Sequence, residues 1–183
     1  MNTREKILQE TEQFILASGI EKLTLSKIAK RLKLSQPAIY KHFKNKEELL
    51  TLLALRWLNG RILVQIFPFD TKNNQEQKEI IHDWLWAVAN AKYQAHLKTP
   101  EMFALYTTYI GENLELSRNH IMEMIESLKT AAKLETAEQA AAYIQAFAYF
   151  HHPKIAPQWD EAFQAQFENV WKIIANQPEN LLT

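Results

Sequence analysis

Glycine is scarce in this chain, and that scarcity limits the folds that the chain can adopt. Only three of its 183 residues are glycine, against six prolines. Sheets joined by tight hairpins need glycine or asparagine at turn positions with positive φ. A chain with so few turn formers is expected to build long helices with short connections. The sequence therefore predicts an all-α fold.

The overall composition is that of an ordinary globular protein, with 47% hydrophobic and 23% charged residues. Cysteine is absent, which excludes disulfides, thiolate metal sites and a cysteine nucleophile. The first residues, MNTREK, are polar and unlike a secretory signal. No apolar run approaches the ~18 residues that span a bilayer. We expect a cytoplasmic protein that does not enter a membrane.

The net charge of zero conceals an uneven distribution of sign. Residues 1–50 carry ten Lys or Arg against six Glu, and the run from Lys22 to Lys46 holds eight basic residues and no acidic one. The remaining residues carry eleven basic against fifteen acidic groups. A run of like charge is often only a solvated face. The separation of sign nevertheless favours a basic module that binds a polyanion, joined to a module that does not.

Capping residues divide the first fifty positions into short helices. Asn2, Thr24, Ser35 and Asn45 are of N-cap type, and each precedes a stretch of helical apolar periodicity. Pro37 falls in the first turn of the helix after Ser35, where its missing N–H costs nothing. The sequence thus predicts a longer helix to about residue 17, two helices of barely two turns, and a fourth helix.

Two short helices braced by a longer one form a helix-turn-helix, whose second helix enters the major groove with its N-terminal residues first. Glutamine can bond an adenine edge, and proline and alanine can contact a thymine methyl. Hydroxyl and ammonium groups beside helix starts suit phosphates. The alternative is that these side chains only cover a small helical domain. The predicted DNA-binding residues are Thr24, Ser26, Lys27, Ser35, Gln36, Pro37, Ala38, Tyr40, Lys41, His42 and Lys46.

The stretch LTLSKIAKRLKLSQPAIYKHFKNKEELL, residues 23–50, resembles the DNA-binding segment of the tetracycline-repressor (TetR) family. It departs at Lys33, where family members often have glycine in the turn. A lysine in the left-handed region there would cost on the order of 1 kcal/mol. The resemblance implies a dimeric all-α transcription regulator, usually a repressor, that leaves its palindromic operator when a small molecule fills the C-terminal domain. No cofactor is expected.

The rest of the chain is predicted to be a helical bundle, giving about nine helices in all. We divide the chain into a helix-turn-helix DNA-binding domain, residues 1–48, and a helical ligand-binding and dimerisation domain, residues 49–183. Prolines, Gly111 and capping boxes set the expected bounds. The helices expected from the fourth onward span residues 46–66, 75–97, 99 to just before 111, 112–133, 136–150 and 158–175.

The middle helices are rich in aromatic residues. Rings at helical spacing are more often core than ligand site. Tyrosine, tryptophan and histidine nevertheless have polar tips that can orient a small amphipathic or hydrophobic ligand. The predicted pocket residues are Trp57, Trp84, Tyr93, His96, Phe103, Tyr106, Tyr109 and Phe147. The adjacent His151 and His152 lack a carboxylate at ligand spacing, so no metal site is predicted.

The last two helices carry apolar stripes, one of them lined with small residues that allow close helix packing. The alternative is that both stripes belong to the core of a single chain. A palindromic operator needs two copies of its reader, which favours a homodimer. The predicted interface residues are Ala137, Ala141, Ile144, Ala148, Phe163, Phe167, Val170, Trp171 and Ile174.

The leading functional hypothesis is a repressor released by a ligand. An activator and a ligand-independent repressor are alternatives that the sequence does not separate from it. A different class, a small-molecule carrier or enzyme with an incidental basic bundle, stays open. Against an enzyme, the chain has no nucleophile elbow, phosphate loop or metal-ligand spacing.

Overall fold

The computed structural model describes residues 2–176, and every regular element in that range is helical. This confirms the all-α fold that the scarcity of glycine predicts. None of the described helices is both long and apolar enough to cross a bilayer. The α-helices are α1 (Thr3–Ser18), α2 (Leu25–Arg31), α3 (Gln36–Tyr40), α4 (Lys46–Trp57), α5 (Gln77–Lys98), α6 (Pro100–Tyr106), α7 (Leu114–Ala132), α8 (Ala137–Ala146) and α9 (Phe163–Ala175).

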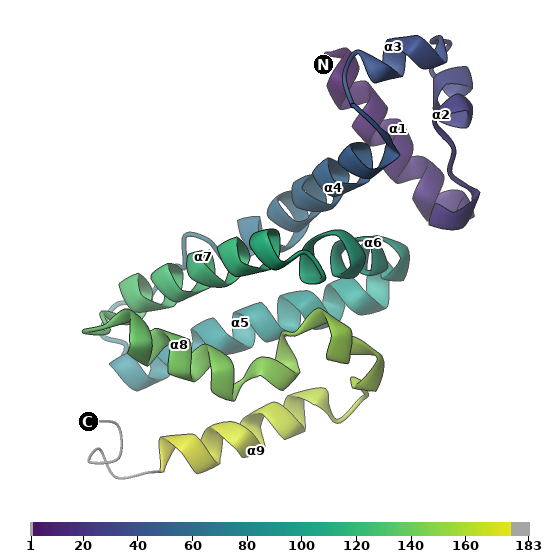
Figure 1. The fold of residues 1–183 in the computed structure, drawn as a ribbon. Coiled ribbons are helices and arrows are strands. Elements are labelled where there is room, and N and C mark those ends of the chain that lie inside the picture. The colour runs from purple at the N-terminus through teal and green to yellow at the C-terminus, as the bar shows by residue number, and fades with distance from the viewer. Residues whose placement is uncertain (1, 177–183) are drawn as a thin grey trace.

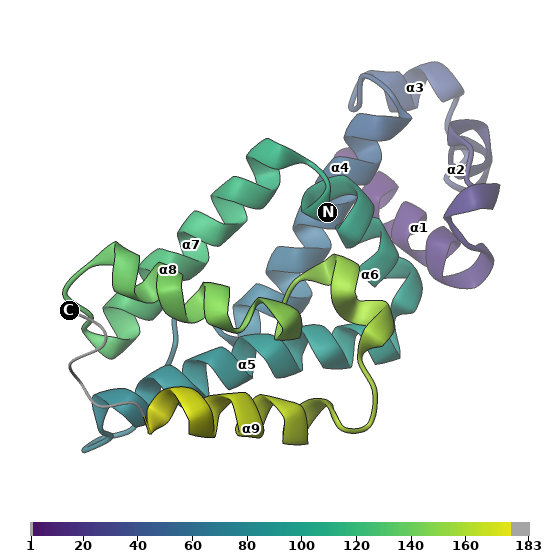
Figure 2. The ribbon, with the colours of Figure 1, turned by 60° about the horizontal axis from the view of Figure 1, so that its bottom comes forward.

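Helices α1 to α3 form a head at one end of the molecule, and α5 to α9 form a larger body (Figure 1). Helix α4 runs from the head into the body. Within the body, α5 lies between α9 on one side and the pair α7 and α8 on the other (Figure 2). Buried apolar side chains from the head, α4 and the body form one core cluster. The head is therefore attached to the body through packed side chains as well as through the chain itself.

The four N-caps predicted from the sequence are in place at the starts of α1 to α4. Asn2 Oδ1 accepts a hydrogen bond from the backbone N–H three residues later at 2.8 Å. Thr24, Ser35 and Asn45 accept equivalent bonds from the third residue of their own helices. Pro37 is the second residue of α3, so its missing N–H removes no bond within the helix. The caps matter because α2 and α3 are too short to form alone.

The turn between α2 and α3 contains a residue in the left-handed region, at the position where family members often have glycine. Lys33 has φ 55°. Its backbone N–H donates to Lys30 O at 3.2 Å, and Leu34 N–H donates to Ala29 O at 2.9 Å. This pair of bonds is a Schellman motif, which ends a helix with one residue in the left-handed region. A lysine therefore occupies a position that glycine would adopt without strain.

The fourth helix departs from its predicted course. Helical structure continues to Gln65, close to the predicted end at residue 66, but the regular α-helix stops at Trp57. A π-helical turn, Leu58–Ile62, and a 3-10 turn, Leu63–Gln65, complete the segment. Gly60, a weak helix former, lies at the centre of the π turn. The expectation of one uninterrupted α-helix was wrong.

The boundaries near the C-terminal end also differ from those predicted. Helix α8 ends at Ala146, and the last predicted turn is a separate 3-10 helix, Ala148–Phe150. The final helix begins at Phe163 instead of residue 158, because a 3-10 helix, Pro153–Gln158, occupies the preceding stretch. That element contains a second proline, which cannot donate the backbone bond that a continuing α-helix needs.

Replacing Lys33 by glycine is expected to stabilise the chain, because glycine adopts the left-handed region without a Cβ clash. Lys33→Gly should raise the free energy of unfolding by about 0.5–1 kcal/mol, measured by urea denaturation. Lys30→Gly, an exposed lysine inside α2, is the matched control and should lower the same quantity by about 1 kcal/mol. Equal losses in both variants would contradict the strain at Lys33.

Candidate nucleic-acid interface and ligand region

Helix α3 presents the side chains predicted to read DNA bases. Ile39 is fully buried and fixes the helix against the head, and Phe43 just beyond it is 1% exposed. Gln36 and Pro37 are exposed, and Tyr40 keeps 48% of its surface accessible. Inward packing therefore turns the N-terminal residues of α3 to solvent, as a base-reading helix requires.

The start of α2 gathers hydroxyl and ammonium groups beside α3. Thr24 and Ser26 are exposed, with their hydroxyl oxygens 3.1 Å apart. Lys27 is exposed too, and its ammonium donates to Lys22 O at 2.8 Å. Ser35 caps α3 through its side chain. Hydroxyl side chains and helix N-termini are frequent phosphate ligands.

The residues that follow α3 complete the predicted set. Lys41 and His42 are exposed, while Ala38 is half-buried. Lys46 is also half-buried, and its ammonium donates to Leu23 O at 2.8 Å. That bond fastens the first turn of α4 to the chain just before α2. A lysine ammonium has three donors, so a phosphate can bind Lys46 without breaking this link.

Four of the eight predicted pocket residues meet in one ring cluster inside the body. Trp57 of α4 lies 6.4 Å from Phe103 and 6.3 Å from Tyr106, centroid to centroid. His96 of α5 lies 5.3 Å from Phe103. Trp159, which the sequence prediction omitted, lies 6.0 Å from Phe103. These five residues are called the ring cluster below.

Of the other four predicted pocket residues, Tyr93 borders the ring cluster, with its ring 6.3 Å from Trp159, and the remaining three lie elsewhere. Tyr93 stacks on Phe163 of α9 at 4.4 Å, and Trp84 stacks on Phe67 at 6.1 Å. Phe147 packs among the phenylalanines of the body core. Tyr109 lines an open hollow of about 570 Å³ between the first turn of α4 and the segment from 108 to 113. Aromatic density along the sequence therefore does not correspond to one site.

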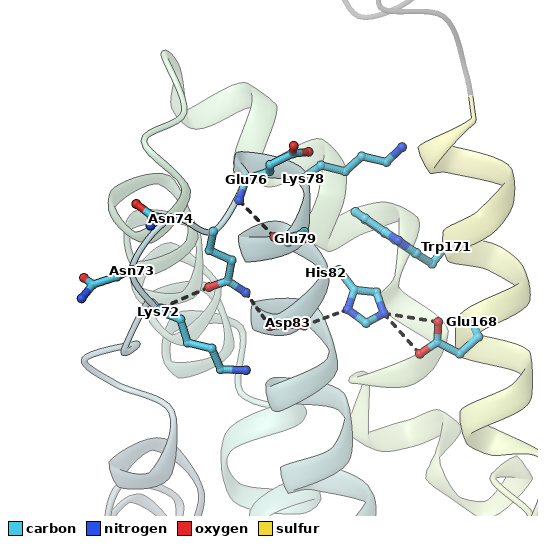
Figure 3. A pocket seen from close by; sticks show the side chains of 11 residues that line it. Lys72, Asn73, Asn74, Glu76, Lys78, Glu79, His82, Asp83, Glu168 and Trp171 are labelled. Atoms are coloured by element: carbon cyan, nitrogen blue, oxygen red, sulfur yellow. Dashed lines mark hydrogen bonds and ion pairs between the residues drawn. The ribbon is translucent and has the colours of Figure 1, made fainter.

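A second hollow, of about 710 Å³, opens between the loop before α5, the first turns of α5, and α9 (Figure 3). Its lining is mostly polar. Figure 3 shows His82 between two carboxylates, with Nδ1 3.0 Å from Asp83 and Nε2 3.2 Å from Glu168. Trp171 forms one wall and lies 5.1 Å from the His82 ring. At this hollow, the contact between His82 and Glu168 links α5 to α9.

The sequence prediction missed a buried polar group in the body. Lys92 of α5 is 1% exposed, and its ammonium donates to Tyr106 Oη at 3.1 Å and to His151 O at 3.1 Å. His120 Nε2 of α7 lies 3.2 Å from the same nitrogen. Burial lowers the pKa of Lys92 to about 7. The sequence does contain a pattern that predicts this burial. Lys92 follows Val88 at helical spacing on the apolar face of α5, which predicts a charged side chain in the core.

The predicted dimer interface is partly occupied by the chain's own core. Ile144, Phe163 and Phe167 are 3%, 1% and 0% exposed within one chain. Phe167 packs 5.0 Å from Trp86 of α5 and 4.9 Å from Phe147. The chain's own core therefore covers these three side chains, Phe163 and Phe167 by packing against Trp86 of α5, and their role in an interface stays a prediction. The predicted positions that keep accessible surface are Ala137, Ala141, Ala148, Val170, Trp171 and Ile174.

Two family models match this chain along most of its length. Residues 7–53 match the model of the bacterial regulatory proteins of the tetR family. Residues 78–171, half of the chain, match the model of the tetracyclin repressor-like C-terminal domain. The chain belongs to the tetracycline-repressor family.

Individual relatives are more distant. A segment of 51 residues is 43% identical to tetracycline repressor protein class C of Escherichia coli, and it covers 28% of this chain and only 23% of that protein. The crystal structure of BioQ with its natural double-stranded DNA operator has a TM-score of 0.62 at 19% identity, over 97% of this chain and 100% of that one. TetR from Acinetobacter baumannii AYE has a TM-score of 0.63 at 17% identity, over 96% and 97%. The likeness establishes the fold of a DNA-binding transcription regulator of this family.

Gln36 is expected to read a base. Gln36→Ala should lower affinity for the specific operator by ~1–3 kcal/mol and leave binding to random DNA nearly unchanged, because a base-edge bond is lost and no charge is removed. Fluorescence anisotropy on both DNAs at one salt concentration measures this. Equal weakening on the two would show that Gln36 does not contact a base.

The stability of the chain is expected to depend on pH through Lys92. Between pH ~7 and ~9 the unfolded chain holds a proton on this lysine that the folded chain releases, so the free energy of unfolding should rise with pH, by up to a few kcal/mol. Lys92→Met should flatten this slope, and the exposed lysine variant Lys98→Met should keep it. Urea denaturation at a series of pH values tests this, and identical slopes in all three proteins would exclude a depressed pKa at Lys92.

Proposed function

We propose that this protein is a homodimeric, sequence-specific transcription regulator that represses its target and leaves its operator when a small amphipathic or hydrophobic ligand binds the body. The observation that carries the proposal is the exposed N-terminal end of α3, held outward by buried Ile39 and flanked by the phosphate-type groups of α2 and Lys46. Residues 1–48 then serve DNA binding, and residues 49–183 serve ligand binding and dimerisation.

The proposed contacts follow from side-chain chemistry. Gln36 leads α3 into the major groove, where its amide can form two bonds to adenine. Pro37 and half-buried Ala38 offer apolar surface for a thymine methyl group. Tyr40 and Lys41 lie where the phosphate backbone borders the groove. The operator is then a palindrome, with one half-site for the α3 of each subunit.

A dimer has an accessible surface on which to form. Helices α8 and α9 lie on the side of the body away from the head (Figure 1). Alanines of α8 and Val170, Trp171 and Ile174 of α9 keep accessible surface. Small side chains allow close approach of a second helix pair. We propose that two bodies pack through these helices and place the two α3 helices ~34–36 Å apart, one turn of B-DNA.

Helix α4 is the proposed connection between ligand and DNA. Its first turn is bonded to Leu23 through Lys46, and Arg56 in its last turn pairs with Glu5 of α1 at 3.1 Å. Trp57, at its end, belongs to the ring cluster. A ligand that rearranges the cluster therefore displaces a helix that also carries the head, and a few degrees of pivot move α3 by ångströms.

Two structures of similar proteins contain DNA or a small molecule, and they support this proposal. BioQ was crystallised with its double-stranded DNA operator, and a variant of TetR from Acinetobacter baumannii AYE with minocycline. That second structure has a TM-score of 0.58 at 20% identity, over 96% of each chain. The identity of the ligand of this chain does not follow from theirs.

Selection of the operator from random DNA tests the DNA-binding part of the proposal. The selected sequences should be palindromic, and affinity should fall steeply with salt, because lysines and arginines of the head displace counterions from phosphates. A carrier or an enzyme with an incidental basic head would select no sequence. A reporter gene behind the selected operator distinguishes a repressor from an activator.

Ligand and operator should oppose each other by an equal factor. A compound that lowers operator affinity 5–150-fold, about 1–3 kcal/mol of coupling, must itself bind operator-bound protein more weakly by that same factor. Calorimetric titration of any releasing compound, with and without saturating operator, measures this. Identical ligand affinities in the two titrations would contradict release by the ligand.

A further inference from the structure

Lys92 is held at the centre of the body by groups from three other segments. Its ammonium lies 3.1 Å from Tyr106 Oη of α6 and 3.2 Å from His120 Nε2 of α7. It also donates to His151 O, 3.1 Å away, after α8. Four segments of the chain therefore meet at one nitrogen atom.

This buried cation has no counter-ion among residues 2–176, where no carboxylate pairs with it. The titratable groups that face it are neutral or basic: Tyr106, His120, His151 and the exposed His152. Their pKa values are shifted toward the neutral forms, mainly by burial. A buried charge is normally paired, and an unpaired one strongly favours its neutral form. The cluster therefore lacks a negative charge.

One ring nitrogen of His120, Nδ1, lacks a hydrogen-bond partner beside Lys92. When Lys92 is charged it can only donate, so His120 Nε2 accepts its bond and the imidazole hydrogen lies on Nδ1. His120 is 7% exposed, and no group within residues 2–176 bonds to its Nδ1. A buried N–H without an acceptor costs as much as a lost hydrogen bond. An anion beside Lys92 would neutralise the cation, and an acceptor beside Nδ1 of His120 would satisfy the unpaired donor.

We propose that the ligand of this regulator is a small organic anion whose carboxylate binds Lys92 and His120 and whose apolar part packs against the ring cluster. This rests on the proposed function and specifies the class of its ligand. A carboxylate fits better than a phosphate because it brings one charge to match one lysine, and because a dianion would lose more hydration in an apolar interior. Tyr106 joins the two parts of the site, since its hydroxyl bonds Lys92 and its ring lies 5.6 Å from Phe103.

The same geometry connects the anion to the head. Tyr106 and Trp57 lie 6.3 Å apart, and each is the last residue of an α-helix that passes into a π-helical turn. π-helical turns occur often at functional sites. An anion that draws the ammonium of Lys92 away from Tyr106 changes the contact at the junction between α6 and α4. That contact lies at the body end of the helix that carries the head.

Proton uptake is a consequence specific to this site. With its pKa lowered to about 7, Lys92 is largely neutral at pH 8. A bound carboxylate stabilises the charged form and raises that pKa again. Binding of the anion at pH 8 should therefore take up on the order of one proton per subunit. A neutral ligand in the same body should take up none.

The experiment uses the full chain and a panel of acids, each paired with its primary amide: octanoate, benzoate, phenylacetate and indole-3-acetate. Calorimetry in two buffers with different ionisation enthalpies gives affinity and proton uptake together. At least one acid should bind ~10-fold or more tightly than its amide, because a buried charge pair is lost in the amide. Lys92→Met should abolish that preference, and Lys98→Met, an exposed lysine of the same helix, should keep it.

His120→Leu provides a second variant if Lys92→Met fails to fold, and it should weaken binding of the acid more than binding of the amide. A panel in which no acid binds better than its amide overturns the proposal, as does a preference that survives Lys92→Met. A neutral compound that releases the operator equally from the wild type and Lys92→Met refutes the anion while the regulator stands. An acid that binds through Lys92 in a chain that selects no operator refutes the regulator while the anion site stands.

Discussion

The buried face of α4 is the constraint on which the rest of the molecule depends. Leu49, Leu50, Leu53 and Ala54 are fully buried, so the helix is apolar on the side that packs against α1 and α6. Two of the three helices of the head, α2 and α3, are too short to form alone, and they depend on α1, which α4 holds in place. The cost of separating head from body is therefore the cost of exposing these side chains. Because α1 also contacts α6, two contacts hold the head to the body, and α4 is the helix that runs from one into the other.

The body holds a second constraint of the opposite kind. Its centre contains Lys92, a base with neutral or basic neighbours, where an apolar side chain would pack at lower cost. Buried ionisable groups of this kind lower the stability of the fold, and they occur most often at functional sites such as ligand-binding sites. The ring cluster and Lys92 share Tyr106, so the polar and apolar parts of the body meet at one residue. That residue lies against the end of α4.

The head could be predicted in detail because its determinants are local. The caps at Ser35 and Asn45, the proline in the first turn of α3 and the lysine at the left-handed turn are all properties of a few neighbouring residues. The body could not be predicted to the same depth. Periodicity shows that Phe163 and Phe167 form a stripe, but it does not say whether α5 or a second chain covers that stripe. Similarly, the partners of Lys92 come from three distant segments, and no pattern along the sequence indicates which of them meet.

The most direct test of the account is the distance between the two heads of a dimer. The chain has no cysteine, so Lys44→Cys provides a single labelling site on exposed surface beside α3. Pulsed electron paramagnetic resonance on the doubly spin-labelled dimer gives the separation with operator DNA bound and with a releasing compound bound. With operator, one narrow separation is expected, consistent with α3 helices ~34–36 Å apart, and the compound should shift it by several ångströms. The same separation in both states would contradict a head moved by α4.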